Sequence, residues 1–199
     1  MGDGVIVYTI SARYIKNSGK FLMRASNVVK VSKKELGRAL SSGDIEASGC
    51  RFMLYSDLKD IRSLGELRLP VVILYLNTAN MGHYVCLFKN RSGINFYDPY
   101  NYKPDHEFEF ANPRLNFEKG PRGSYLSRLL ASSDESFGPI TYNEVAMQSS
   151  DPAVATCGRH CIVRLRYSQL TQDEYVRFIK AVALKLKITI DELMCFMTR

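Results

Sequence analysis

The chain has 199 residues, 46% of them hydrophobic, which is enough to bury the core of one globular domain and excludes a disordered tail. Its formal net charge of +7 favours polyanionic partners such as nucleic acid or an acidic protein surface. Neither a run of about 18 apolar residues nor a charged amino-terminal region followed by a long apolar segment occurs, so we expect no membrane span and no secretory signal.

The first 48 residues contain a short apolar stretch, Val5-Ile6-Val7-Tyr8, and a predicted helix that Ser32 opens. Glu35 follows Ser32 by three residues, which is the spacing of a capping box. The polar run Ser41-Ser42-Gly43 is expected to end this helix.

The middle of the chain has the pattern of a sheet. Residues 51–60 (RFMLYSDLKD) are apolar and then turn-like. Pro70 precedes VVILYL, an uninterrupted apolar run that indicates a buried strand. HYVCLFK alternates from His83, turns at Asn90-Arg91-Ser92-Gly93 and resumes as INFYD, which predicts a hairpin.

Residues 103–122 carry three prolines and no sustained period, so they are expected to run across the surface. A short helix near residues 125–130 and a strand near residues 140–147 are expected next.

Beyond Cys157 the pattern is helical, with capping boxes at Thr171 with Glu174 and at Thr189 with Glu192. The order of mixed, then β, then α segments predicts a single α+β domain with an antiparallel or mixed sheet flanked by helices.

The five cysteines are an odd number, spread too widely for a small secreted scaffold, so free thiols and a reducing compartment are expected. They are Cys50, Cys86, Cys157, Cys161 and Cys195.

The segment CGRHC at residues 157–161 is compatible with a metal clip, a dithiol pair or one nucleophilic thiol. A structural zinc site usually has a second short-spaced pair of ligands, which this chain lacks, so no metal is expected. The two thiols lie one helical turn apart, which suits a disulfide poorly and leaves Cys161 as a core residue.

A nucleophilic Cys157 would stand in the first turn of a helix, where the helix dipole and free backbone N–H groups favour an anion. His83 begins one hairpin strand and Asp98 ends the next, so the two are expected side by side, with the aspartate orienting the imidazole. His160 competes as the base, but it shares the helix of Cys157, whereas His83 can face the thiolate across a cleft. His106 is expected to have no catalytic role.

Gly82-His83-Tyr84, Phe96-Tyr97-Asp98-Pro99-Tyr100, a glutamine and Thr156-Cys157-Gly158-Arg159-His160-Cys161 follow one another in the order His, Asp, Gln, Cys. This order resembles that of the adenovirus-protease and SUMO-protease-like cysteine peptidases. The Cys-Gly-x-His-Cys form is most similar to the maturation proteases of virophages and of Polinton or Maverick elements. The resemblance covers roughly residues 50–180 and implies the α+β fold of that family, with the nucleophile at a helix N-terminus.

The resemblance implies Cys157 as the nucleophile, His83 as general base and then acid, and Asp98 as its orienting partner. It also implies an oxyanion hole made by Gln148 and backbone N–H groups at the cysteine. Gln148 lies nine residues before Cys157, farther than is usual in the family. Either the segment SSDPAVAT holds extra residues, or the backbone N–H groups contribute more.

Residues 51–60 resemble the segment that borders the substrate groove in these viral proteases, which gives Met53, Tyr55 and Asp57 as substrate-binding candidates. Tyr84 stands where many relatives have tryptophan, and it is expected to pack beside the imidazole and the substrate.

The function implied by the resemblance is a viral cysteine endopeptidase that processes capsid and other virion precursors at glycine-containing motifs. We expect a monomer in the virion and the infected cell, without membrane contact and without a required cofactor, and with DNA as a possible activator through non-specific contact.

Residues 1–48 would be an extension of unclear role, residues 49–187 the catalytic core and residues 188–199 a C-terminal helix of the one domain. Two alternatives stay open: a deubiquitinase or deSUMOylase effector of the same fold, and a non-enzymatic module with a metal-binding or structural role.

Overall fold

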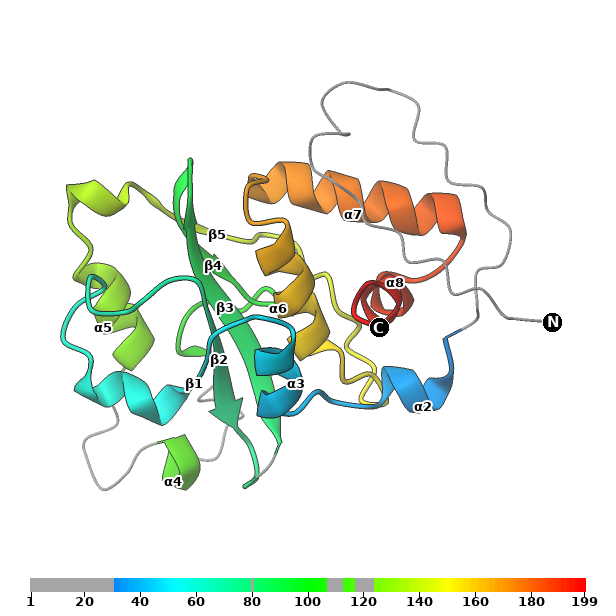
Figure 1. The fold of residues 1–199 in the computed structure, drawn as a ribbon, viewed down its shortest axis with the longest axis horizontal. Helices are drawn as coiled ribbons and strands as arrows, with labels where there is room; N and C mark the ends of the chain where they lie inside the picture. Colours follow the sequence, from blue (N-terminus) through cyan, green and yellow to red (C-terminus); the bar gives the residue numbers. More distant parts are fainter. Residues whose placement is uncertain (1–30, 80, 107–112, 117–123) are drawn as a thin grey trace.

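The centre of the fold is a five-stranded mixed sheet with the strand order β1-β2-β3-β4-β5. The structure is a computed structural model that describes residues 31–79, 81–106, 113–116 and 124–199 (Figure 1). The strands are β1 (Phe52–Leu54), β2 (Val71–Leu76), β3 (Gly82–Asn90), β4 (Gly93–Tyr97) and β5 (Ile140–Tyr142). The predicted α+β class and the mixed sheet are confirmed.

The β3–β4 hairpin sets the register of the sheet. Both β2–β3 and β3–β4 are antiparallel, whereas β1–β2 and β4–β5 are parallel. Cys86 pairs with Tyr97, so the same register carried three residues further brings His83 opposite Tyr100. The predicted buried strand and the predicted hairpin are both confirmed.

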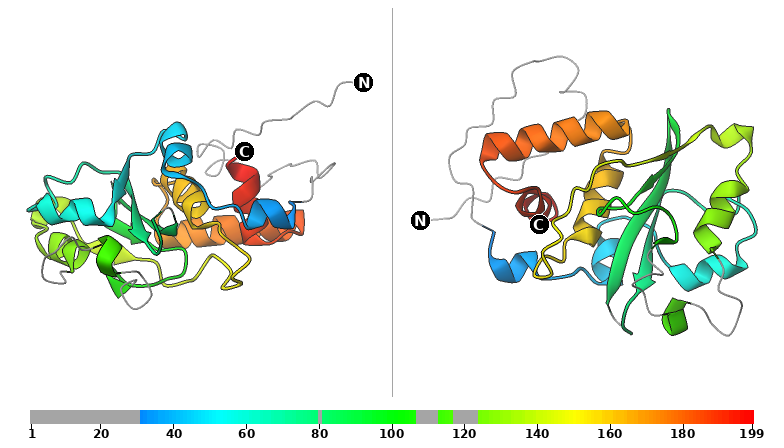
Figure 2. Two further views of the ribbon diagram at one scale, coloured as in Figure 1. Left: turned by 90° about the horizontal axis from the view of Figure 1, so that it is seen from below. Right: turned by 180° about the vertical axis from the view of Figure 1, so that it is seen from behind.

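Helices cover both faces of this sheet. They are α2 (Lys33–Leu36), α3 (Ser42–Ala47), α4 (Pro113–Asn116), α5 (Tyr125–Ala131), α6 (Cys157–Arg166), α7 (Gln172–Leu186) and α8 (Ile190–Met197), with 3-10 turns η1 (Tyr55–Asp60) and η3 (Glu135–Phe137). Figures 1 and 2 show α6, α7 and α8 on one side of the sheet, and α5 with the η1 segment on the other.

Two core clusters lie on the two faces because side chains of a strand alternate. Val72 and Leu74 belong to the first cluster, together with α6, α7 and α8. Val71, Ile73 and Tyr75 belong to the second cluster, together with η1 and α5. The continuous apolar run of β2 is therefore explained by burial on both faces.

The N-terminal region differs from its prediction at one point. Ser32 does open α2, and its side chain accepts a hydrogen bond from the backbone N–H of Glu35. Ser41, however, begins the second helix α3 through a capping box with Asp44, so the prediction that the polar run ends a helix is wrong. A serine followed three residues later by an acid can act as a start signal, and that signal prevails here.

Most of the later predicted elements are confirmed, and one strand is shorter than predicted. The helix near residues 125–130 and both late capping boxes are confirmed by α5, α7 and α8. The predicted strand at 140–147 is shorter, because β5 ends at Tyr142 and a loop leads to α6. The apolar stretch at residues 5–8 lies outside the described residues, as does most of the expected surface excursion.

Helix α6 is buried along nearly its whole length between the sheet and α8. At its far end the guanidinium of Arg164 lies over the rings of Phe88 and Tyr175, 4.5 and 4.7 Å from their centroids. The same guanidinium donates hydrogen bonds to the backbone carbonyls of Tyr167 and Leu170. The buried charge is thus partnered, and it holds α6 on the face of the sheet.

Gly158 permits the close approach of the first turn of α6. A Cβ atom at this position would lie 3.2 Å from atoms of Ile45 and Tyr84 and 3.4 Å from Leu40. Leu40 and Ile45 are buried in the first cluster, so residues of the predicted N-terminal extension are part of the packing around α6. The glycine therefore allows tight packing at the start of α6.

No helix among the described residues is long and apolar enough to span a membrane.

Replacing Gly158 with alanine is expected to lower the free energy of unfolding by about 1–3 kcal/mol, because overpacking outweighs the better helix propensity of alanine. The measurement is urea denaturation of the full chain. Gly43→Ala in α3 is the matched control, because a Cβ there meets nothing closer than the Ser41 hydroxyl at 3.7 Å. Equal stability of the two variants would contradict this account of Gly158.

Candidate active site

His83 and Asp98 form a buried pair at the end of the β3–β4 hairpin. His83 is the second residue of β3, and Asp98 follows the last residue of β4. Nε2 of His83 lies 3.1 Å from Oδ1 of Asp98, and their exposed fractions are 5% and 0%. The register of the hairpin brings them together, as the sequence predicted.

Asp98 is fixed from its backbone as well as its carboxylate. The Asn143 side chain accepts a hydrogen bond from the Asp98 backbone N–H at 2.9 Å and donates one to the Asp98 carbonyl at 2.6 Å. The backbone N–H of Tyr100 donates to Oδ1 of Asp98 at 2.7 Å. The carboxylate is therefore held in place before any ligand arrives.

Cys157 is the first residue of α6 and is 6% exposed. It lies close enough to His83 to contribute to the raised pKa of that histidine. The structure thus brings together Cys157, His83 and Asp98 from a helix, a strand and a strand end.

The environment of His83 favours its charged form. Burial by itself lowers the pKa of His83, but the negative charge of Asp98, their hydrogen bond and the interaction with Cys157 outweigh burial and raise it well above 6.5. A raised histidine pKa means that the imidazolium is stable at neutral pH, where it can pair with a thiolate.

Tyr100 connects the histidine with Gln148. The rings of Tyr100 and His83 stack with their centroids 4.9 Å apart. The Gln148 side-chain amide donates to the Tyr100 hydroxyl at 2.8 Å and to the Val154 carbonyl at 3.3 Å. Burial, followed by the charge of Cys157, raises the pKa of Tyr100 to about 12, so its hydroxyl stays protonated at neutral pH.

The segment between Gln148 and Cys157 folds into a compact loop. Its polar turn is closed by Asp151, which accepts a hydrogen bond from the backbone N–H of Ala153 at 2.8 Å. The backbone N–H of Ala155 donates to the Leu36 carbonyl at the end of α2, also at 2.8 Å. The segment thus forms a turn that rests on α2, while Gln148 lies beside Tyr100.

His160 is occupied by a second buried pair. Its Nε2 lies 3.1 Å from Oδ1 of Asp191 on α8, and its Nδ1 lies 3.4 Å from the Tyr97 hydroxyl. Burial raises the pKa of Asp191, but hydrogen bonds from His160, Thr156 and Ser149 outweigh that effect and lower it. Both ring nitrogens of His160 are engaged away from Cys157, which favours His83 as the base.

Cys161 is a core residue, as the sequence suggested. It is fully buried, and its thiol donates to the Tyr84 carbonyl at 3.4 Å. Burial, with the neighbouring Cys86 thiol, raises the pKa of Cys161 well above 9. Cys157 and Cys161 are both free cysteines.

The predicted substrate contacts are not gathered in one place. Tyr84 lies in the first cluster beside Gly158, with its hydroxyl bonded to the Leu40 carbonyl. Met53 packs against the second cluster, on the opposite face from Cys157. Asp57 is exposed and caps η1 through the backbone N–H of Leu54.

Tyr55 is a core residue, whereas the sequence placed it at the substrate groove. It has no exposed surface, and its ring stacks on Tyr75 and Tyr125 at centroid distances of 4.5 and 5.4 Å. Its hydroxyl donates to Asp105 at 2.7 Å. The structure assigns Tyr55 to packing of the second cluster, because a residue without exposed surface cannot contact a bound peptide.

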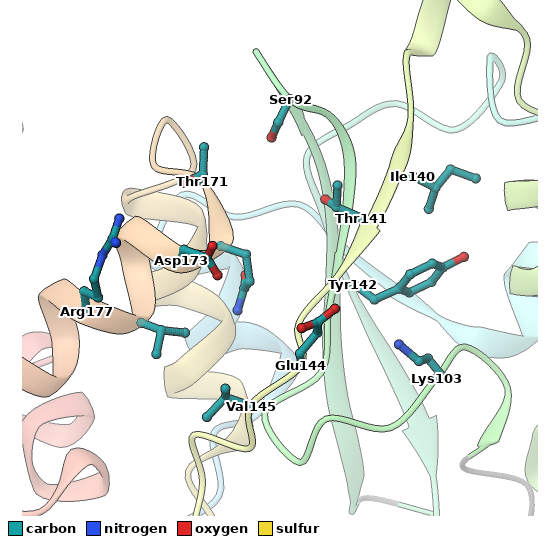
Figure 3. Close-up of a pocket in the computed structure, with 12 residues that line it drawn as sticks. Ser92, Lys103, Ile140, Thr141, Tyr142, Glu144, Val145, Thr171, Asp173 and Arg177 are labelled. Carbon is teal, nitrogen blue, oxygen red and sulfur yellow. The ribbon is translucent and has the colours of Figure 1, made fainter.

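A cavity of about 620 Å³ lies away from these residues (Figure 3). It is formed by β5 and the following residues on one side and by the N-terminal part of α7 on the other, with Thr141, Glu144, Asp173 and Arg177 among its lining. None of the candidate catalytic residues lines it. Within the residues that the structure describes, no group of three or more His, Cys, Asp or Glu side chains is placed to hold a metal ion.

The sequence pattern gave no indication of a role for Asn143 or Asp191, and it assigned none to Tyr100. Asn143 lies 45 residues from Asp98 in the chain, and Asp191 lies 31 from His160. Asp191 was visible only as part of a capping-box helix start. A polar residue at such a start is ordinarily exposed, so only its burial reveals a further contact.

Fold and site together define an α+β protein in which a cysteine, a histidine and an aspartate meet where α6, β3 and β4 converge. No family model matches the chain. The chain is 28% identical over 167 residues to "Uncharacterized protein V9" of Sputnik virophage, an alignment that covers 80% of this chain and 94% of that protein. The expected link with virophages is supported at this coarser level, and the relative's name carries no activity.

The origin of the raised pKa of His83 can be tested with Asp98→Asn. We expect the pKa of His83 to fall, because the neutral amide removes the charge that offsets burial. In the wild type, the stability that the charged His83 contributes is complete below its unfolded pKa of about 6.5 and is lost as the pH rises through the folded pKa. Asp98→Asn lacks this contribution, so we expect the variant to be less stable than the wild type at neutral pH. NMR titration of the ring protons measures this, and with only three histidines in the chain, His106 and His160 serve as internal references. A pKa of His83 that is unchanged by the substitution would contradict the assignment.

Proposed function

We propose that the chain is a cysteine endopeptidase of the adenovirus-protease and SUMO-protease-like fold, which processes capsid and other virion precursors of a virophage-related element. The observation that carries the proposal is the buried His83–Asp98 pair, with Cys157 at the N-terminus of α6 close enough to raise the pKa of His83. A thiol, a base and an orienting carboxylate in this order are what nucleophilic acyl transfer requires. The virophage relative supplies the viral setting.

In the proposed reaction His83 takes the proton of the Cys157 thiol, and the thiolate sulfur attacks the carbonyl carbon of the scissile peptide bond. The imidazolium of His83, held by Asp98, then gives its proton to the leaving amine as the C–N bond breaks. Water attacks the resulting thioester with His83 again acting as base, and the carboxylic acid product leaves with the thiol restored. The raised pKa of His83 supports this assignment, because it favours the imidazolium that each half-reaction forms.

The oxyanion would be held by first-turn N–H groups of α6 and by the amide of Gln148. The Thr156 side chain does not cap the N-terminus of α6, so it does not compete with an anion for these N–H groups. The Gln148 amide has two N–H donors, and the longer of its two bonds, 3.3 Å to the Val154 carbonyl, is the weaker one to exchange. A donor aimed at such an oxyanion is worth about 10²–10³ in kcat.

A preference for glycine beside the scissile bond is consistent with the burial of the thiol. Cys157 is 6% exposed, with Tyr84 packed against the next residue, Gly158. A substrate residue without a side chain can approach such a sulfur most easily. This supports the proposed cleavage at glycine-containing motifs.

Co-expression of the chain with the major capsid precursor from the same genome tests the proposal. We expect the wild type to yield cleaved products by mass spectrometry and Cys157→Ala to yield none. Cys50→Ala is the matched control, because Cys50 is a half-buried free cysteine outside the site and its loss is expected to leave cleavage intact.

Three results would contradict the proposal: an intact precursor with the wild type, cleavage that survives in Cys157→Ala, or stoichiometric zinc in a protein that does not cleave. Probes built on ubiquitin and SUMO separate the effector alternative. A maturation protease should label poorly with them, whereas strong labelling at Cys157 would replace the capsid substrate with a ubiquitin-like one.

We also propose DNA as a non-specific activator, with a binding surface near α2, α7 and α8. Helix α8 contacts both α2 and α7, so exposed basic residues from distant parts of the chain lie at one end of the molecule (Figure 1). These residues are Lys33, Lys34, Arg38, Lys180, Lys185, Lys187 and Arg199. Glu35 and Asp44 offset part of this charge through ion pairs with Arg199 and Arg38.

Cleavage measured with and without DNA over a salt series tests this surface. We expect DNA to accelerate cleavage at low salt and to lose its effect as salt rises, because counterions compete for the phosphates. The double variant Lys33→Glu with Lys34→Glu should respond less to DNA than the charge-matched control Arg62→Glu with Arg68→Glu, whose arginines are also exposed. Activity that ignores both DNA and salt would contradict the proposal.

A further inference from the structure

The carboxylate of Asp191 connects both ends of the loop between Gln148 and Cys157. Its Oδ2 accepts a hydrogen bond from the backbone N–H of Ser149 at 3.0 Å, directly after Gln148. Its Oδ1 accepts a hydrogen bond from the Thr156 hydroxyl, directly before Cys157. The same Oδ1 lies 3.1 Å from Nε2 of His160, one turn into α6.

This use of Asp191 is not explained by helix capping alone. The chain contains the pattern Thr-x-Asp-Glu twice, at residues 171–174 and 189–192, and both threonines and glutamates form capping boxes. The aspartate between them is exposed at Asp173 but only 5% exposed at Asp191. The helix dipole favours an acid at both positions, so the burial of Asp191 and its three partners must serve something other than the helix start.

One consequence concerns Gln148. The peptide group that joins Gln148 to Ser149 is held at both residues, since the Gln148 N–H donates to the Pro99 carbonyl at 3.1 Å and the Ser149 N–H donates to Asp191. The side chain of Gln148 therefore leaves from a fixed backbone. The segment forms its turn around Asp151, beyond this fixed backbone.

The other consequence concerns the N-terminus of α6. A threonine at this position ordinarily turns its hydroxyl to the N–H groups of its own helix. Thr156 instead donates its hydroxyl to Asp191 and makes no such cap. The Thr156 hydroxyl is thereby prevented from competing for the first-turn N–H groups at Cys157.

We propose that Asp191 is a positioning residue of the peptidase reaction, which holds Gln148 and the uncapped start of α6 in the arrangement that an oxyanion requires. The inference rests on the proposed function and adds to it a residue that touches neither the substrate nor the thiol. It assigns His160, fully buried, to the same network, where its contact with Asp191 fastens α6 to α8.

The test is steady-state kinetics of the full chain on a peptide spanning a mapped capsid cleavage site, combined with the rate of Cys157 alkylation by iodoacetamide. Asp191→Asn is expected to lower kcat by about tenfold to a hundredfold with little change in KM, the size expected for a small misplacement of catalytic groups. Alkylation should keep its wild-type rate, because it needs the thiolate of Cys157 and forms no oxyanion. Asp173→Asn is the matched control for losing an acid at the same position of a capping-box helix, and it should behave as the wild type.

Thr156 provides a second pair of variants in case Asp191→Asn folds poorly. Thr156→Val removes the hydroxyl with little change in shape and should lower kcat in the same way, whereas Thr156→Ser keeps the hydroxyl and should restore it. Wild-type kcat in both Asp191→Asn and Thr156→Val overturns the inference. So does a parallel fall of kcat, alkylation and thermal stability, because that is the signature of a merely structural role. A wild type without Cys157-dependent cleavage overturns the proposed function itself, and this inference with it.

Discussion

The close contact between α6 and the sheet is the constraint on which the candidate site depends. Cys157 belongs to the helix, and its partners His83 and Asp98 belong to the hairpin, so the three meet only if the helix lies near enough to β3. Gly158 favours this approach, because a Cβ there would lie 3.2–3.4 Å from atoms of Tyr84, Leu40 and Ile45. The anchored guanidinium of Arg164 holds the other end of the helix.

Two buried histidine–aspartate pairs lie on either side of this contact and act on different parts of it. The pair of His83 with Asp98 lies beside Cys157, and the charge of Asp98 helps to raise the pKa of the histidine. The pair of His160 with Asp191 lies one turn further along α6 than Cys157 and joins α6, α8 and the loop before Cys157. The two pairs have the same composition but different neighbours, because burial decides which partners each pair can reach.

The residues before β1 and those of the C-terminal helix take part in the same arrangement. Ile45 of α3 packs against the start of α6, and the Leu36 carbonyl at the end of α2 accepts a hydrogen bond from the loop that precedes Cys157. Asp191 comes from α8, near the end of the chain. A division of the chain into an extension, a core and a terminal helix therefore describes the sequence better than it describes the packing.

Local patterns in the sequence determined the hairpin, the buried strand β2, the capped helices α7 and α8 and the pairing of His83 with Asp98, because each depends on neighbours within one element or one turn. The order of histidine, aspartate and cysteine is the basis of the proposed peptidase activity, which stays a prediction. Only the tertiary structure decided that Tyr55 is a core residue, that Gly158 allows tight packing and that His160 is bound to Asp191. Those facts depend on contacts between residues tens of positions apart, and burial arises from the packing of whole elements, which no local period encodes.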